Sequence, residues 1–492
     1  MISKQLKLII IFLAAILLLI GALILVKLIV PDDTVEAPKL ELLEGEAEGS
    51  DTKPRIIEQL AEKDVEQITV HNSNGTFTFV NDVKDSLTYL KDYENYPIST
   101  EMTSSLYSRI SSFLVTRIDT APTDLSTYGL DAGSDPAYLE ITKFDKTVYK
   151  LYFGLRSADG SFYYMMVDGR NVVYAINNSN IENLIFLPVE SFISTLAAPV
   201  MADVSYVNIQ KISIRRNGKD FVAFEKVPEN YKQETGYTLT HKMTFPTNYL
   251  VNLTNFERLL ASFAELYASE VVGFGYYLKN DYSEFEKYGF NEKITEIYYS
   301  YQDVPTYLYV GGKTSDGTGY YVYSLHYDTL LIVPVESLPF IDWELGDFIG
   351  EYLFQMSIDF VETIEVETAD KSVKFDLVKT EDKLSVMANG KELGLNENGD
   401  PMNFRQFFKN ILRINWDGYS DIPESLGKPM LKLKITTCFG EVFDYSFYQI
   451  SALRCFLVYN GNGQFYTEKA TLDKFIDNFN RVINNEEVIL DY

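Results

Sequence analysis

The chain has 492 residues, more than one hydrophobic core usually organises, so we expect several domains. Hydrophobic residues make up 46% of it and charged residues 23%, which is typical of a folded chain and excludes a disordered one. The formal net charge of −27 argues against nucleic acid and anionic lipid as partners, because both repel an acidic surface; alternatively, the acidity serves solubility alone.

The amino terminus carries a long apolar run. Residues 8–26 are apolar without interruption, and after Lys27 the run continues to Val30. A transmembrane helix needs about 20 apolar residues, whereas the apolar region of a cleaved signal has about 7–15. No small-x-small cleavage site follows. We therefore predict an uncleaved signal anchor over 8–30; a cleaved signal peptide is the alternative, and it would leave the chain in the same compartment.

The charges around this run predict its orientation. Lys4 and Lys7 precede it, and acidic residues dominate from Asp32 to Asp51. Positive charge stays inside, so residues 1–7 are predicted to be a cytoplasmic tail and the bulk of the chain to lie outside the cell membrane, with a single pass. Residues 31–55 are predicted to be an acidic extracytoplasmic linker that its own charge keeps extended.

Three blocks of similar pattern follow, which we predict to be domains over 56–200, 201–350 and a diverged 351–492. Each block begins with an alternating hairpin around a turn such as Asn74-Gly75 and continues with an amphipathic helix. A run of tyrosine-rich strands and a closing segment complete it. The predicted fold class is α+β: an N-terminal transmembrane helix and three tandem duplicated domains, each an antiparallel β-meander with one or two packed helices.

The elements of block one are predicted from alternation and from Gly or Asp-Gly punctuation. Its helix is predicted over 102–117, with Thr100 as N-cap. Its strands are predicted at 65–71, 76–80, 138–141, 148–153, 162–167 and 172–176, and its closing segment over 181–196.

Blocks two and three repeat this order. Block two is predicted to have strands at 207–214, 221–224, 297–301, 305–310, 319–324 and 330–333 and a helix over 254–267. Block three is predicted to have strands at 364–367, 373–377, 431–436, 442–447, 455–459 and 465–466 and helices over 404–414 and 472–483.

Two short motifs recur in the first two blocks. Tyr128-Gly129-Leu130 returns as Tyr288-Gly289-Phe290, and Pro-Val-Glu-Ser occurs at 188–191 and at 334–337. With the strands at 151–154, 160–167 and 172–176 and their echoes at 307–311 and 317–322, residues 125–130 and their echo at 285–290 resemble the bacterial family called domain of unknown function 4340. The resemblance implies a membrane-anchored protein without an assigned activity, and it supplies no catalytic residue. It also implies a link to auxiliary components of ABC-type transporters, which some members resemble or lie beside.

The recurring motifs supply the candidate interaction residues. Glu190 and Glu336 each offer a carboxylate to a partner or cation; alternatively, each simply lies near a helix N-terminus, where its charge is favourable. The pairs Tyr163-Tyr164 and Tyr320-Tyr321 offer an aromatic platform for a sugar. Ordinary packing is the alternative, because neighbouring residues of a strand point to opposite faces.

Catalytic and metal sites are not expected. The three histidines show no metal-ligand spacing, and no Cys-x-x-Cys or Gly-x-Ser-x-Gly motif occurs. We therefore predict no catalytic residue, no cofactor and no metal. Cys438 and Cys455 lie on or beside the first and third strands of a meander, too far apart for a disulfide, and are predicted to be buried free thiols.

The functional hypothesis is a non-enzymatic one: a membrane-tethered extracytoplasmic interaction protein, accessory to an ABC-type transport or export system. Its partners would be the membrane, through the N-terminal helix, and an ABC permease or another envelope protein. The alternative is a cell-envelope module that binds glycan or peptide through exposed tyrosines. An envelope hydrolase is a third hypothesis and the least favoured.

Overall fold

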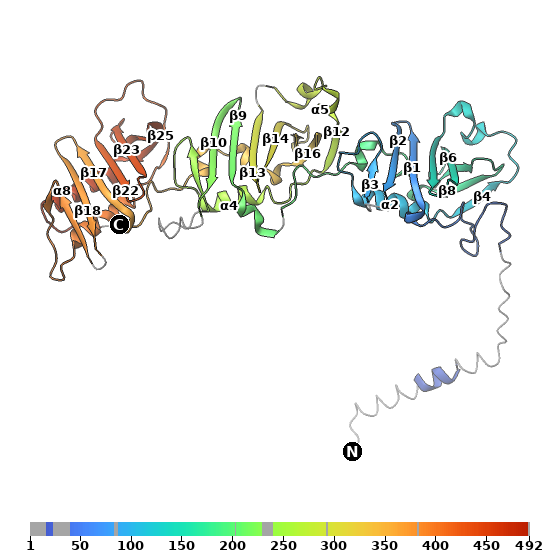
Figure 1. Ribbon diagram of the computed structural model, residues 1–492, viewed down its shortest axis with the longest axis horizontal. Helices are drawn as coiled ribbons and strands as arrows, with labels where there is room; N and C mark the ends of the chain where they lie inside the picture. Colours follow the sequence, from blue (N-terminus) through green and yellow to red (C-terminus); the bar gives the residue numbers. More distant parts are fainter. Residues whose placement is uncertain are drawn as a thin grey trace, which may run out of the picture. The chain divides into compact units, whose positions relative to one another are not determined.

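A computed structural model describes residues 16–22, 40–82, 87–201, 203–228, 240–291, 294–380 and 383–490 (Figure 1). The chain divides into two compact units, Met1–Phe192 and Ile193–Tyr492. Most of the anchor predicted over 8–30 lies outside the described residues, and the part that is described, 16–22, is helical. Within the described ranges no helix is both long and apolar enough to cross a membrane.

The first unit contains one antiparallel sheet, sheet 1. Its strands lie in the order β3-β2-β1-β5-β6-β7-β8-β4 in the part of the chain that the structure describes. The elements are β1 (Val65–Asn72), β2 (Gly75–Asp82), β3 (Leu87–Leu90), α2 (Thr100–Ile110), β4 (Val115–Asp119), β5 (Ala137–Lys143), β6 (Val148–Arg156), β7 (Phe162–Val167) and β8 (Val173–Asn177). The short 3-10 helices are η1 (Glu62–Asp64), η2 (Ser126–Tyr128), η3 (Ala132–Ser134), η4 (Asn178–Asn180) and η5 (Val189–Phe192).

Sheet 2 in the second unit has the same connectivity, β11-β10-β9-β13-β14-β15-β16-β12. Its strands are β9 (Lys211–Arg216), β10 (Lys219–Lys226), β11 (His241–Phe245), β12 (Glu270–Phe274), β13 (Thr295–Tyr301), β14 (Val304–Lys313), β15 (Gly319–Ser324) and β16 (Thr329–Pro334). Its helices are α4 (Leu253–Ala261), α5 (Tyr276–Lys279), α6 (Leu345–Phe348), η6 (Asp203–Asn208), η7 (Phe285–Tyr288), η8 (Val335–Ser337) and η9 (Pro339–Asp342).

Sheet 3 repeats the order with a two-residue addition at one edge, β20-β19-β18-β17-β22-β23-β24-β25-β21. Its strands are β17 (Val361–Thr368), β18 (Ser372–Lys379), β19 (Leu384–Ala388), β20 (Lys391–Glu392), β21 (Gly418–Tyr419), β22 (Leu431–Thr437), β23 (Val442–Gln449), β24 (Arg454–Tyr459) and β25 (Asn462–Glu468). Its helices are η10 (Ile358–Phe360), α7 (Met402–Ile411) and α8 (Lys469–Ile483). Three mostly antiparallel sheets with few helices are thus confirmed.

The helices explain which face of each sheet becomes core. Alternate strand residues such as Ile68, Leu139 and Phe153 are buried. So are Leu106 and Ile110 of α2, which lie one turn apart on one side of the helix. The helix begins where the Ser99 hydroxyl accepts a hydrogen bond from the Met102 amide at 3.3 Å. The N-cap is therefore Ser99, and the prediction of Thr100 was wrong by one residue.

One predicted helix in each block extends too far, whereas the helix predicted over 472–483 lies within α8. The prediction of 102–117 was wrong at its carboxyl end, because 115–119 form β4, and α4 and α7 likewise end several residues before the predicted 267 and 414. Apolar residues after each helix suit either a further helical turn or a strand. In block one the free edge of the sheet selects the strand for 115–117, since β4 pairs with β8 there, whereas 262–264 and 412–413 form turns.

The segment between the predicted anchor and sheet 1 is held against the first unit over residues 40–55. The guanidinium of Arg117 in β4 pairs with Glu46, whose side chain is fully buried, and Arg170 donates to Gly45 O at 2.6 Å and to Ile56 O at 2.6 Å. The described part of the acidic linker therefore does not stay extended. Arg117 neutralises the charge of Glu46, a contact that self-repulsion along the sequence did not anticipate.

Sheets 2 and 3 are joined by side chains of the segment after β11. The Tyr459 hydroxyl donates to Asn248 Oδ1 at 2.6 Å, and the rings of Tyr249 and Tyr459 lie 5.1 Å apart. Trp416 Nε1 donates to Gly350 O at 2.7 Å. These buried contacts place both sheets in one compact unit. The domain boundaries predicted at residues 200 and 350 stay predictions.

Both cysteines are free thiols. Cys455 lies buried in β24, while Cys438 follows β22 and is exposed, so the prediction of a buried thiol was wrong for Cys438. The strand β23 separates β22 from β24, as expected for a meander.

Candidate functional site

The Tyr-Gly motif of each of the first two blocks presses its backbone onto a strand. Gly129 and Gly289 adopt left-handed conformations, with φ of 65° and 81°, that few side chains tolerate. A Cβ on Gly154 of β6 would collide with Tyr128 O, and one on Gly311 of β14 would lie 2.6 Å from Tyr288 O. The motif and the strand glycine are therefore one packing unit.

Each of these strand glycines lies within a bulge. The register between β6 and β7 shifts after Phe153 and resumes with Arg156 opposite Tyr163. The register between β14 and β15 shifts after Val310 and resumes with Lys313 opposite Tyr320. In both sheets the bulge thereby places a cation beside the first tyrosine of the predicted pair.

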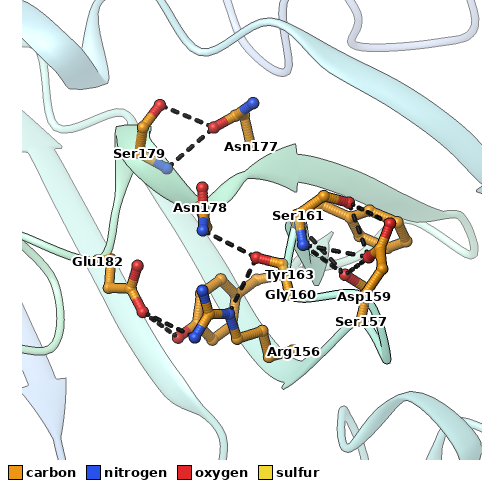
Figure 2. Close-up of polar contacts among 11 residues, drawn as sticks. Arg156, Ser157, Asp159, Gly160, Ser161, Tyr163, Asn177, Asn178, Ser179 and Glu182 are labelled. Carbon is orange, nitrogen blue, oxygen red and sulfur yellow. Dashed lines mark hydrogen bonds and ion pairs between the residues drawn. The ribbon is translucent and has the colours of Figure 1, made fainter.

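The first tyrosine cluster consists of Arg156, Tyr163 and Glu182 (Figure 2). Arg156 Nη1 lies 3.3 Å from Glu182 Oε1, and the Tyr163 hydroxyl reaches the same oxygen at 3.4 Å. The Tyr163 ring packs on Phe186 with centroids 4.9 Å apart. Burial, together with the Glu182 charge, raises the pKa of Tyr163. All three polar groups remain partly exposed, so they can contact a partner.

A carboxylate-centred turn follows the bulge and supports this cluster (Figure 2). Asp159 accepts from the Ser157 hydroxyl at 2.6 Å and from the Ser161 amide at 3.1 Å. These hydrogen bonds, first that of Ser157, lower the pKa of Asp159 to about 2. Arg156 Nε and Asn178 Nδ2 both donate to Gly160 O, at 3.1 and 2.8 Å. The polar groups of the turn are thus hydrogen-bonded within the turn and to the neighbouring Arg156 and Asn178.

The same turn recurs after the second bulge. Asp316 accepts from Thr314 Oγ1 at 2.5 Å and from the Thr318 amide at 3.1 Å. The Thr314 hydrogen bond is the largest cause of the lowered pKa of Asp316. A hydroxyl residue, an aspartate and a second hydroxyl residue therefore build the same loop in both sheets.

The second tyrosine cluster consists of Lys313, Tyr320 and Asp342. Asp342 Oδ2 accepts from Lys313 Nζ at 2.9 Å and from the Tyr320 hydroxyl at 3.0 Å. Lys313 Nζ also lies 5.1 Å from the Tyr320 ring centroid. Burial raises the pKa of Tyr320, and the Asp342 hydrogen bond adds to this. Tyr320 is only 4% exposed, so the tyrosine of this copy is less open to a partner than Tyr163, while the side chains of Lys313 and Asp342 are exposed.

The second tyrosine of each pair packs on the Tyr-Gly motif. The ring of Tyr164 lies 5.0 Å from that of Tyr128, and the ring of Tyr321 lies 4.8 Å from that of Tyr288. Both Tyr164 and Tyr321 are half-buried. Their contacts match the packing alternative considered for these pairs.

The predicted glutamates do not join either cluster. Glu190 is half-buried in η5 and Glu336 is exposed in η8; neither makes a hydrogen bond or ion pair with the residues that the structure describes. The acidic partners of Tyr163 and Tyr320 are instead Glu182 and Asp342. Both follow the strand to which their tyrosine's strand pairs, so only the sheet pairing identifies them.

The histidines pack against or hydrogen-bond to other residues of the chain. His241 Nε2 bonds Ile209 O at 2.7 Å, and burial lowers the pKa of His241 to about 4. His71 stacks on Tyr138 at 4.8 Å. Burial lowers the pKa of His326. Among the described residues no group of three or more His, Cys, Asp or Glu side chains is arranged to hold a metal ion.

Two overlapping stretches of the chain match one family model, described as Domain of unknown function (DUF4340), at residues 89–291 and 242–424. Together they cover well over half of the chain. The first match begins in β3 and ends just beyond η7; the second begins in β11 and ends after β21. No curated protein matches the chain.

Proposed function

The chain belongs to the DUF4340 family, and from that membership and its amino-terminal sequence we propose that it is a membrane-tethered extracytoplasmic interaction protein. The observation that carries the proposal is the apolar run over 8–30, with basic residues before it and acidic residues after it. In the proposal the run is a single-pass signal anchor, residues 1–7 are cytoplasmic, and the three sheets lie outside the cell.

The partner we propose is the permease of an ABC-type transport or export system, to which the chain is an accessory without catalysis of its own. The first tyrosine cluster supports a binding role, because Arg156 and Glu182 are partly exposed and stand beside an aromatic ring. Such a set offers a planar donor, an acceptor and an apolar face to a protein surface.

Recovery of partners from membranes tests the proposal directly. The full chain, tagged at its carboxyl end, is purified from detergent-solubilised membranes. A multi-span permease and its ATPase are expected to co-purify, in smaller amounts from an Arg156→Ala and Glu182→Ala double variant. Recovery of no membrane partner, or fractionation of the chain away from membranes, would overturn the proposal.

The two free thiols provide an independent test of location. Cys438 is exposed and Cys455 is buried. A membrane-impermeant maleimide is expected to label intact cells at Cys438, and the Cys438→Ser variant to remain unlabelled. Labelling only after the cells are lysed would place this part of the chain inside and contradict the proposed topology.

A cell-envelope module that binds glycan or peptide is a second candidate. The observation that favours it is the row of tyrosines on the outer face of sheet 2, where Tyr307 is 41% exposed. Retention on cell-wall polysaccharide tests this candidate, and it should fall when Tyr307 is changed to alanine.

A further inference from the structure

The face of sheet 2 opposite the core carries two adjoining depressions. In β14 the side chains alternate, so that Leu308 and Val310 are buried while Tyr307 and Tyr309 point outward. Each depression has a volume of about 280 Å³, and Tyr309 lines both. The pair together is within the size range of small-molecule sites. We call them the polar depression and the apolar depression.

The polar depression combines hydroxyls with a neutralised ion pair. It is lined by Ser213, Arg215, Glu296, Ile297, Tyr298, Tyr307 and Tyr309. Arg215 Nη1 lies 3.0 Å from Glu296 Oε2, and its Nε lies 3.0 Å from Asp220 Oδ1. Its Nη2 donates to Gly218 O at 2.8 Å. The guanidinium is thus already matched by carboxylates, so this site favours an uncharged ligand over an ionic one.

The tyrosines of the polar depression have unused hydrogen-bonding capacity. The hydroxyls of Tyr298, Tyr307 and Tyr309 make no hydrogen bond to any other residue within the described ranges. The rings of Tyr298 and Tyr307 lie 5.0 Å apart and inclined by 50°. Each hydroxyl can donate and accept, while each ring offers an apolar face. A ligand with hydroxyl groups around a ring that has C–H faces matches both properties.

The apolar depression suits a small alkyl group. Its lining is aromatic and aliphatic: Tyr282, Phe285, Phe290, Ile294, Tyr309, Tyr323 and Leu325. The ring of Phe285 lies 5.0 Å from that of Tyr323 and 4.9 Å from that of Phe290. The Tyr323 hydroxyl is bonded to Asp328 at 2.7 Å, so the ring itself faces the depression as an apolar surface. A methyl group placed there leaves water without breaking a hydrogen bond.

The corresponding face of sheet 1 is arranged differently. Lys150 Nζ lies 3.8 Å from the Tyr138 ring centroid, and His71 stacks on that ring at 4.8 Å. These contacts cover the aromatic faces with the chain's own side chains. Tyr152 of sheet 1 stands at the β6 position that Tyr309 takes in β14, two residues before the strand glycine. It therefore provides a matched control position.

We propose that the two depressions on sheet 2 bind an uncharged N-acetylated amino-sugar oligosaccharide. One sugar ring lies on Tyr309, its hydroxyls bond the tyrosine hydroxyls and the Arg215–Glu296 pair, and its acetamido methyl enters the apolar depression. The net charge of −27 excludes an acidic glycan. The inference rests on the proposed function in one respect: the proposed extracytoplasmic location is where the chain would meet such a glycan.

Calorimetric titration of the purified full chain tests the inference with four defined probes: tetra-N-acetylchitotetraose, cellotetraose, de-acetylated chitotetraose and a proline-rich peptide. The acetylated sugar is expected to bind with a Kd on the order of 1 mM or tighter. Cellotetraose, which has the hydroxyls without the acetamido methyl, is expected to bind about tenfold more weakly. The de-acetylated sugar lacks the acetamido methyl but is cationic and is attracted by the acidic chain, so its binding is expected to fall with added salt, whereas binding of the acetylated sugar is not.

Variants assign the binding to the two depressions. Tyr309→Ala is expected to weaken acetylated-sugar binding at least about tenfold, whereas Tyr152→Ala on sheet 1 leaves it unchanged. Leu325→Lys at the rim of the apolar depression is expected to remove the preference for the acetylated sugar. Leu325 is 37% exposed, so this change is expected to leave the fold intact.

Three results would overturn the inference: no sugar binding, equal binding of the acetylated sugar and cellotetraose, or binding of the peptide alone through Tyr309. Because the titration uses the isolated chain, its failure says nothing about recovery of a permease from membranes. Absence of a membrane partner likewise leaves the titration result intact.

Discussion

The two tyrosine clusters occupy the same place in their sheets with different residues. Arg156 in one copy stands where Lys313 stands in the other, and Glu182 and Asp342 supply the carboxylates. The cation and tyrosine oppose each other in both because the bulge puts them there. The recurrence therefore marks a demand of the fold, and the clusters differ in the exposure of the tyrosine, which is half-buried at Tyr163 and buried at Tyr320.

The outer faces of sheets 2 and 3 differ more strongly. Sheet 2 presents tyrosines above two depressions, whereas sheet 3 presents ion pairs such as Lys434–Glu365 and Lys432–Glu367, at 3.5 and 3.2 Å. Exposed pairs of this kind contribute little to stability and keep a face solvated. The comparison teaches that duplicated positions preserve the sheet, while the outer-face positions that differ between copies give each sheet its own surface chemistry.

The largest effect is expected from a substitution in the packing unit that sheets 1 and 2 share, which consists of the Tyr-Gly motif and the strand glycine. Gly154→Ala should lower the free energy of unfolding of the first unit by about 3 kcal/mol or more, because its Cβ meets the Tyr128 backbone oxygen. Hydrogen exchange in urea, followed on peptides of β5 to β7, measures this. Gly312→Ala is the control, since its Cβ would lie 3.4 Å from Tyr288 O. Equal stability of the two variants would refute a shared packing role.

The next largest effect is expected at the last residue of the first strand of each sheet, which is Arg216 in β9 of sheet 2 and Asn72 in β1 of sheet 1. Arg216 donates to the carbonyls of Trp343, Phe340 and Ile341, at 2.6, 3.0 and 2.8 Å. Arg216→Met should therefore cost about 2–3 kcal/mol, and Arg216→Lys less, because lysine restores part of the donor set. Loss of amide protection in η9 is the measurement.

Asn72 has the corresponding role in sheet 1, with hydrogen bonds to Ile185 O and Leu187 O at 2.7 and 2.8 Å. Asn72→Leu should cost less than Arg216→Met because it removes fewer hydrogen bonds. A larger loss of stability for the Asn72 variant would reverse this part of the comparison.

A pH-dependent effect is expected in the first unit, where Glu46 holds the segment 40–55 in place. Burial raises the pKa of Glu46, but hydrogen bonds from Arg117 and the Leu43 amide outweigh it, so the pKa lies below its ordinary 4.5. A lowered folded pKa stabilises the docked segment above the ordinary pKa, and the stabilisation is lost as pH falls through the folded pKa. Proteolysis by an acid-active protease within 40–55 should therefore increase on acidification.

The matched variants for this segment are Glu46→Gln and Glu48→Gln. Glu46→Gln should expose 40–55 to proteolysis already at neutral pH, because the Arg117 guanidinium loses its charged partner. The exposed Glu48 should be replaceable without effect. Cleavage of the Glu46 variant at the wild-type rate would contradict the assigned clamp.

The smallest effect compares the tyrosines of the two clusters. Tyr320→Phe should cost about 1 kcal/mol, because the buried Tyr320 loses its 3.0 Å hydrogen bond to Asp342. Tyr163→Phe should cost only about 0.3 kcal/mol, since its 3.4 Å bond to Glu182 competes with water. Thermal unfolding of the two variants compares these losses, and a larger loss at Tyr163 would show that the first cluster is the more tightly structural one.

The local pattern predicted the hairpins and meanders well and the sheet edges poorly. Alternation in stretches such as 65–71 and 148–153 reflects one buried face, a property of the residues themselves. The edge strands β4 and β12 are short and follow a helix without alternation, so only the free edge of a completed sheet makes them strands. The same reason explains why the predicted helix over 102–117 was too long.

For the candidate site, too, the sequence indicated some of the residues and missed others. The tyrosine pairs and the Tyr-Gly motifs were visible as repeats in the chain, but their mutual packing was seen only in the structure. The partners Glu182 and Asp342 carried no local signal, and Tyr307 and Tyr309 looked like ordinary strand residues. Their alternation with buried Leu308 and Val310 was the available signal that they face outward.

The sequence by itself determined the family, the repeated order of hairpin, helix and meander, and the prediction of an amino-terminal anchor, because periodicity, motifs and apolar length are properties of short stretches. Tertiary structure alone decided which carboxylate meets each tyrosine, that residues 40–55 dock on Arg117 and Arg170, and that the tyrosines of sheet 2 surround two depressions. These arrangements depend on strand register and on bulges, which bring together residues that are far apart in the chain.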